Sequence, residues 1–229
     1  MRYLLLVLSM LLLSATAARA DVDVSIGISI PGVRIGINVP AYPRLVPVPG
    51  YPVYYDPAIH LNLFFYDGLY WVLHGDQWYV SSWYNGPWDL VDPYDVPAYI
   101  LLIPVHYYRV PPPFFRGWRV DAAPHWDAHW GREWYERRRD WEHHDPRAAP
   151  PAAPLPSYQR KYSGERYPRE QEQQRNIRTE RYRYEPREAV TQKHYQRQHP
   201  QGSAPGQQKK RDDRGEGKRD DHGQGRKNN

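Results

Sequence analysis

Aromatic side chains gather in one short stretch of the sequence, and such rings can bind sugars. Six of them are candidates for ligand binding: Trp71, Trp78, Tyr79, Trp83, Tyr84 and Trp88. The apolar face of a pyranose stacks on an indole or a phenol while neighbouring polar groups take its hydroxyls. Because strand side chains alternate between two faces, about half of these rings can point inward, and we expect some of the others to be exposed. Two interpretations stay open: the rings pack a core alone, or they also form a ligand-binding face.

Two histidines have a spacing that suits a shared metal ion. His125 and His129 lie four residues apart in a segment that we predict to be helical, so both imidazoles can reach one cation from the same side. The HExxH pattern is absent, and two ligands alone leave a metal site incomplete. Packing or solvation of the two rings is the alternative. We predict no cofactor.

The residues that hydrolysis needs are present only as fragments. Ser81 or Ser82 could join His74 and Asp76 in a triad, but no nucleophile elbow or glycine-rich oxyanion loop surrounds them. Up to Tyr108 the chain contains no glutamate, and its aspartates stand mostly at turns, so paired acid–base carboxylates are missing. The chain has no cysteine, which excludes disulfides and thiolate chemistry. We therefore predict a protein that is not an enzyme.

Charge divides the chain into two parts. Residues 21–145 carry 9 basic and 15 acidic side chains, whereas residues 146–229 carry 20 and 11. Arg and Lys neutralise phosphates or carboxylates, and phenol rings can stack. The basic part also contains tyrosines among its arginines: Tyr158, Tyr162, Tyr167, Tyr182, Tyr184 and Tyr195. This composition of residues 146–229 predicts a tail that binds cell-envelope polysaccharide, lipopolysaccharide or the acidic part of a second copy. We predict no nucleic-acid partner. A solvated tether is the alternative.

Turn signals recur at near-regular intervals between residues 61 and 91. Asp67-Gly68, Gly75-Asp76 and Asn85-Gly86 each match a tight hairpin turn and predict an antiparallel meander. The segments 99–103 and 105–110 are candidate edge strands. Over residues 125–144 the period changes, and four indoles fall near one side of a helix: Trp126, Trp130, Trp134 and Trp141. The predicted fold class is α+β, a small aromatic-rich antiparallel β meander packed by one Trp-striped helix and followed by a disordered basic tail.

The chain falls into four predicted segments. Residues 1–20 have the pattern of a signal peptide, with a positive start, an apolar run and the cleavage site Ala18-Arg19-Ala20. Residues 21–60 contain alternating strands between Val22 and Val39, then a Pro-rich connector that we expect to make no ladder hydrogen bonds. Residues 61–145 form the aromatic head, and residues 146–229 form the disordered tail. No segment after residue 20 reaches about 18 apolar residues, so we predict no transmembrane segment after signal cleavage.

Two longer motifs carry a resemblance to known proteins. They are the runs at residues 64–71, FFYDGLYW, and 78–88, WYVSSWYNGPW, together with residues 111–118 and His129-Trp130-Gly131-Arg132. In these residues the chain resembles a family of uncharacterised exported proteins of Gram-negative bacteria. The resemblance covers most of the chain after residue 20. It implies export and the same domain organisation, and it carries no activity, cofactor or catalytic residue.

The sequence thus predicts a periplasmic or secreted protein that binds without catalysis. We expect an anionic envelope polymer or glycan to be held by the basic tail and by exposed aromatics of the head. The alternative is a structural or assembly protein that self-associates through the N-terminal strands, because unpaired strand edges of Val and Ile readily pair with another chain. The tail also contains a degenerate repeat, residues 167–170 and 184–188, each with the sequence Pro-Arg-Glu.

Overall fold

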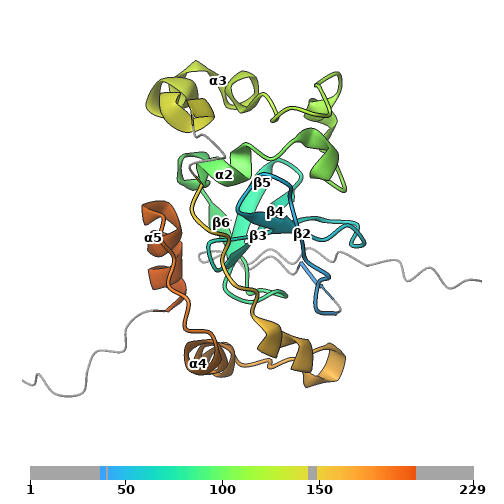
Figure 1. Cartoon of the computed structure of the whole chain (residues 1–229), viewed down its shortest axis with the longest axis vertical. Helices are drawn as coiled ribbons and strands as arrows, with labels where there is room; N and C mark the ends of the chain where they lie inside the picture. The colour runs from blue at the N-terminus through green and yellow to red at the C-terminus, as the bar shows by residue number, and fades with distance from the viewer. Residues whose placement is uncertain (1–36, 40, 144–148, 200–229) are drawn as a thin grey trace, which may run out of the picture. The chain divides into compact units, whose positions relative to one another are not determined.

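A computed structural model describes residues 37–39, 41–143 and 149–199. Six antiparallel strands follow one another in chain order across a single sheet (Figure 1). They are β1 (Val46–Pro47), β2 (Val53–Tyr55), β3 (Asn62–Tyr66), β4 (Leu69–His74), β5 (Gln77–Ser81) and β6 (Asp89–Val91). The predicted meander is confirmed. The alternating strands predicted between residues 22 and 39 lie mostly outside the described residues, as do the signal peptide and residues 200–229.

Local turn chemistry explains two of the three predicted hairpins. Tyr66 pairs with Leu69, which leaves Asp67 and Gly68 as a two-residue turn, and both have positive φ values of 47° and 82°. The next hairpin likewise closes through Gly75-Asp76. The tight turn predicted at Asn85-Gly86 is wrong, because β5 already ends at Ser81 and residues 82–88 form a longer connection to β6. Trp83, Tyr84 and Trp88 in this connection fold under the sheet and pack there.

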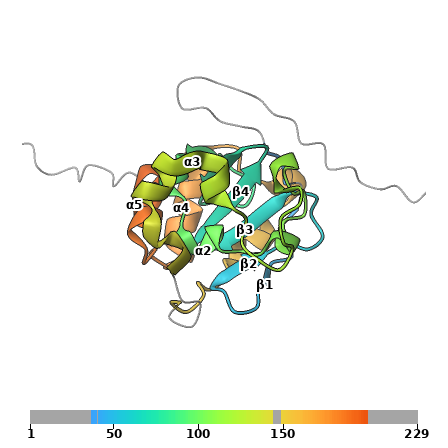
Figure 2. The same ribbon diagram turned by 90° about the horizontal axis from the view of Figure 1, so that it is seen from above.

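One face of the sheet is covered by the segment that follows β6. This segment forms η1 (Pro93–Asp95), α2 (Ala98–Leu101), η2 (Val105–Tyr107), η3 (Pro113–Phe115), α3 (Trp126–Arg137) and η4 (Arg139–His143), where η marks a 3₁₀ helix. The Trp-striped helix predicted over residues 125–144 is confirmed as far as Arg137: Trp126 and Trp134 of α3 are buried in the core, whereas Trp141, also buried, lies in η4. Gly131 interrupts α3 with a φ of 83°, so the helix is kinked there. Figure 2 shows α2 and α3 lying across the strands.

Prolines decide the local structure on both sides of the meander. The edge strands predicted at residues 99–103 and 105–110 are wrong; these segments form α2 and η2, and Pro97 and Pro104 stand at their N-caps, where a missing N–H costs nothing. The connector before residue 60 was expected to make no ladder bonds, which is also wrong. Val53 pairs with Tyr66, and Pro47 is tolerated because β1 is the edge strand.

The opposite face of the sheet is covered by part of the segment that we predicted to be a disordered tail. Residues 149–199 form η6 (Ser157–Lys161), η7 (Gly164–Arg166), α4 (Gln171–Arg181) and α5 (Ala189–Gln198). Residues of η6 and α4 pack on this face, whereas α5 places His194 against Trp71 on the other face. For this segment the prediction is wrong, because tyrosine rings and arginine stems supply the buried surface that aliphatic residues would otherwise give. In Figure 1 the sheet lies between a layer containing α2 and α3 and a layer containing α4. Among the described residues, no helix is both long and apolar enough to cross a bilayer.

The degenerate repeat marks the starts of the last two helices. Glu170 and Glu188 are the N-cap residues of α4 and α5. In α4 the Gln174 amide donates to the carbonyl of Pro168 (2.7 Å), and in α5 Gln192 donates in the same way to Pro186 (3.0 Å). Each repeat is therefore a turn that starts a helix, with a glutamine side chain bonded back to the proline carbonyl.

Candidate functional site

The six aromatic residues predicted to bind ligand are all interior. Trp71, Trp78, Tyr79, Trp83, Tyr84 and Trp88 are at most 5% exposed. Trp71 and Trp78 pack below α3, whereas the other four pack on the opposite face. The expectation that alternation leaves some of these rings exposed is wrong, because a sheet covered on both faces buries both sets. These six side chains form core, and the structure offers no stacking surface on them.

Three of the buried rings, those of Trp83, Tyr84 and Trp88, contact the segments that pack over them. The Trp88 indole donates to the carbonyl of Ile37 (3.2 Å), and the Tyr84 hydroxyl donates to the carbonyl of Tyr162. Burial raises the pKa of Tyr84 to about 12, so this hydroxyl stays protonated near neutral pH. The Trp83 ring contacts Tyr158 and Tyr162, with centroids 6.0 and 5.7 Å apart. Residues 158–162 are thus held in place by contacts with Trp83 and Tyr84.

The two histidines with metal-like spacing each have protein partners. His125 stands just before α3, and its ring meets the edge of Trp118, with centroids 5.4 Å apart. His129 stacks flat on Phe114 at 3.7 Å, and its Nε2 bonds to the carboxylate of Asp76. In the described part of the chain, no group of three or more His, Cys, Asp or Glu residues is placed to hold a metal ion. The structure therefore gives these rings packing contacts rather than a shared ligand.

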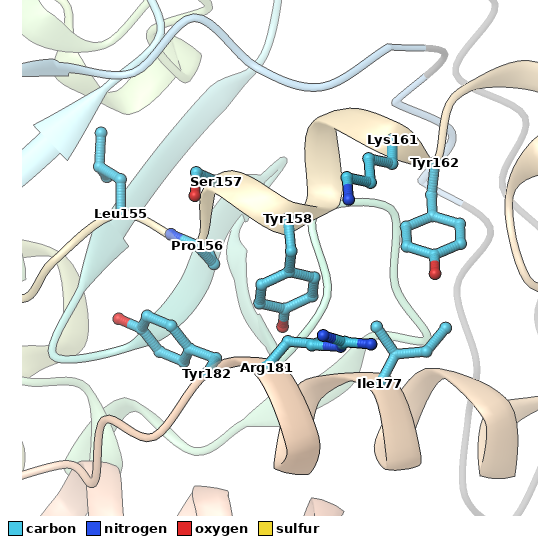
Figure 3. A pocket seen from close by; sticks show the side chains of 9 residues that line it. All are labelled: Leu155, Pro156, Ser157, Tyr158, Lys161, Tyr162, Ile177, Arg181 and Tyr182. Carbon is cyan, nitrogen blue, oxygen red and sulfur yellow. The ribbon is translucent and has the colours of Figure 1, made fainter.

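A pocket of about 390 Å³ lies between η6 and α4. Its lining combines tyrosine rings, aliphatic groups and two cations: Leu155, Pro156, Ser157, Tyr158, Lys161, Tyr162, Ile177, Arg181 and Tyr182. Figure 3 shows the Lys161 ammonium extending from η6 and the Arg181 guanidinium extending from α4 into the space between them. Ile177 lies on the α4 side and Tyr158 on the η6 side. We call this the α4 pocket.

A second pocket, of about 450 Å³, also borders η6. It is lined by Tyr42, Pro43, Arg44, Leu45, Val46 and Arg160, and we call it the β1 pocket. The Arg160 guanidinium lies over the Tyr42 ring, 5.5 Å from its centroid. Neighbouring residues of η6, Arg160 and Lys161, therefore line different pockets. We define the η6 face as the two pockets together.

The η6 face carries four cations, and its two pocket linings contain no acid. Its four cations, Arg44, Arg160, Lys161 and Arg181, are all exposed. Neither pocket lining contains an acidic residue, and the ion pairs found within the described ranges involve other cations. Asp56 is close to the Arg44 main chain, but its carboxylate is buried and accepts three backbone N–H bonds, from Arg44, Ala58 and Ile59. The four side chains are thus free to meet an external anion.

A buried cation lies beneath the same face. Arg178 of α4 is 1% exposed; its guanidinium donates to the carbonyl of Gly68 (2.9 Å) and lies over the Tyr182 and Tyr195 rings. Burial raises the pKa of the Tyr158 phenol, and the Arg178 charge opposes that shift only in part. Burial also raises the pKa of Tyr42. Both phenols therefore stay neutral near pH 7, and the face presents neutral rings among positive charges.

The sequence indicated which residue types form the η6 face but not which segments come together in it. Tyr158, Tyr162 and Tyr182 were named as rings that stack on a polyanion, in a segment taken to be unstructured. Tyr42 and Arg44 were not connected with them, since more than one hundred positions separate the two segments. The alternation of Tyr with Arg and Lys was the available signal. Comparisons add nothing further: no family model, no curated protein and no solved structure matches the chain.

Proposed function

We propose that this protein is a non-enzymatic, exported envelope protein that binds an anionic envelope polymer or glycan through the η6 face. One observation carries the proposal: four exposed cations, which form no ion pair within the described residues, line two pockets that also contain tyrosine rings. The ligand would be a cell-envelope polysaccharide or lipopolysaccharide. The sequence predicted that exposed aromatics of residues 61–145 contact the ligand; in this proposal the tyrosines of the η6 face take that role. The basic segment still supplies the electrostatic attraction.

The chemistry of the face supports binding rather than turnover. Arginine forks match carboxylates and phosphates, and the cations attract anions over a distance because neither pocket lining contains an acid. Such attraction is screened by salt, whereas ring stacking is not. Export is supported by the signal-peptide pattern of residues 1–20, and in that setting an envelope polymer is a better placed polyanion than nucleic acid.

The test is cosedimentation of the chain beginning at Asp21 with isolated cell-wall and outer-membrane fractions at low salt and at about 0.5 M salt. We expect pelleting at low salt that falls as salt rises. The double variant Arg160→Gln, Lys161→Gln removes one cation from each pocket. Because each surface contact between opposite charges contributes about 1 kcal/mol near 4 Å, the loss of two contacts is expected to weaken binding roughly thirtyfold.

The matched control is Arg119→Gln, Arg132→Gln. These two side chains are also exposed, but each already pairs with an acid, Asp121 and Glu136. The control loses the same net charge and is expected to pellet like the parent. Equal losses in both double variants would mean that net charge alone drives binding. If the parent chain does not pellet at all, the envelope-binding proposal is wrong, and self-association through residues 22–39 becomes the function to test.

A further inference from the structure

We propose that the η6 face binds an acidic polysaccharide by two successive carboxylate-bearing sugar units, one in each pocket. This inference rests on the proposed function and specifies its ligand. It is carried by the pairing, in each pocket, of cations with tyrosine rings and apolar side chains. Three further features of the face decide between this ligand and other polyanions.

The two pockets border the same 3₁₀ helix, and we infer that one continuous ligand reaches both. Consecutive residues of η6 line them: Arg160 lines the β1 pocket and Lys161 lines the α4 pocket. Each pocket, at about 450 and 390 Å³, is at the small end of the range for ligand sites, which suits one sugar ring better than an extended oligomer.

Each pocket offers more than charge. In the β1 pocket, the ring of Tyr42 stands beside Leu45 and the two arginines. In the α4 pocket, Tyr158 and Ile177 stand beside Lys161 and Arg181 (Figure 3). A sugar ring has an apolar face that can use these surfaces, whereas a linear polyphosphate has none. The rings therefore favour a glycan over a bare phosphate chain.

The cations can hold the carboxylates of such a glycan. Three of the four are arginines, and an arginine fork takes a carboxylate through two parallel hydrogen bonds. The Ser157 hydroxyl of the α4 pocket adds a neutral donor for a sugar hydroxyl. Two linked units then bind more tightly than one, because occupation of the first pocket raises the effective concentration at the second.

The test is calorimetric titration of the chain beginning at Asp21 with galacturonate, digalacturonate and an oligogalacturonate. We expect the dimer to bind at least about tenfold more tightly than the monomer, and the oligomer to add little per unit beyond the dimer. The methyl-esterified dimer, which has the same ring without charge, should bind much more weakly. Linear polyphosphate with matched charge should bind more weakly than the oligogalacturonate, with a steeper dependence on salt.

Single variants separate the two pockets. Arg160→Gln and Lys161→Gln should each reduce the dimer-to-monomer affinity ratio to about one, while Arg132→Gln on α3 should leave it unchanged. All three positions are exposed, so unchanged melting curves will show that the variants fold. A ratio that survives either η6 variant would overturn the two-pocket inference.

The outcomes also distinguish this inference from the proposal on which it rests. Polyphosphate that binds as tightly as the oligogalacturonate overturns the glycan inference and leaves anionic polymer binding standing. The same holds if envelope fractions pellet the protein but no uronate binds. If neither envelope fractions nor uronates bind, both proposals fall.

Discussion

At the residue scale, His194 of α5 and His199, the residue that follows this helix, couple the packing of α5 to pH. His194 is 1% exposed, and its ring meets Trp71 edge-on, with centroids 5.5 Å apart. His199 stacks on Tyr195 at 4.4 Å. Burial lowers the pKa of both rings, that of His199 to about 4, and the nearby charge of Arg178 acts on His199 in the same direction. Both rings therefore take up protons less readily in the folded protein than in the unfolded chain, where a histidine titrates near pH 6.5.

This difference predicts acid sensitivity between pH 6.5 and pH 4. Because the folded-state pKa lies below the unfolded one, the stability contributed by each neutral histidine is complete above pH 6.5 and is lost as pH falls toward 4. The slope of the unfolding free energy against pH is at most about 1.4 kcal/mol per pH unit for each histidine. Urea unfolding at pH 7, 5.5 and 4.5 measures it.

The double variant His194→Gln, His199→Gln serves as the control for this prediction. Glutamine keeps a polar side chain at each position but does not titrate in this window. We expect the variant to be less stable than the parent at pH 7 and to show a flatter dependence on pH. A parent and a variant with parallel pH profiles would mean that other groups, such as carboxylates, cause the acid loss.

At the scale of elements, the β3–β4 turn fixes the C-terminal segment to the sheet. The Asp67 carboxylate accepts from the Tyr184 hydroxyl (2.6 Å) and from the backbone N–H groups of Arg187 and Glu188 (2.9 Å each). The adjacent Gly68 carbonyl accepts from Arg178. A Cβ on Gly68 would come within 2.7 Å of the Tyr184 ring, so this glycine allows the close approach. One turn thus holds the end of α4 and the start of α5.

We predict that Asp67→Ala loosens this attachment. Hydrogen bonds to a charged group contribute about 1.5–3 kcal/mol each, but they share one carboxylate, so we expect a loss of about 3 kcal/mol in unfolding free energy. Limited proteolysis should then cut residues 182–188 faster. Asp67→Asn is the matched control, because asparagine also tolerates the positive φ and keeps one acceptor oxygen. An alanine variant as stable and as protease-resistant as the parent would contradict the attachment.

Elements set by local chemistry could be predicted, whereas those set by distant contacts could not. The turn at Asp67-Gly68 follows from its own two residues, and the indole spacing of Trp126, Trp130 and Trp134 indicates α3, so both were predicted. Asn85-Gly86 failed as a hairpin because its neighbours Trp83 and Trp88 pack under the far face, and the Asn85 side chain accepts from the Val39 N–H. The η6 face was not predicted for the same reason, because Tyr42 and Arg160 lie far apart in the sequence and come into contact only in the folded chain.

At the scale of the whole molecule, the acidic and basic parts of the chain share one core. Leu63, Phe65 and Val72 of the sheet pack in the same cluster as Ala153 and Tyr182. The Tyr70 hydroxyl donates to the buried Gln159, and the Tyr66 hydroxyl donates to Glu188 (2.8 Å). A head ending near residue 145 is therefore incomplete, because one face of its sheet would be left bare.

Two truncations test this arrangement. A chain ending at Asp145 exposes the apolar face of β3, β4 and β5, so we expect it to bind a hydrophobic dye, to aggregate and to lose cooperative unfolding. A chain ending at His199 keeps every residue of both pockets and both covering layers. It should melt like the full chain and retain salt-sensitive binding to envelope fractions. Cooperative melting of the Asp145 version would show that the second covering layer is dispensable. Lost binding in a well-folded His199 version would instead move the anionic-polymer site from the η6 face to residues 200–229.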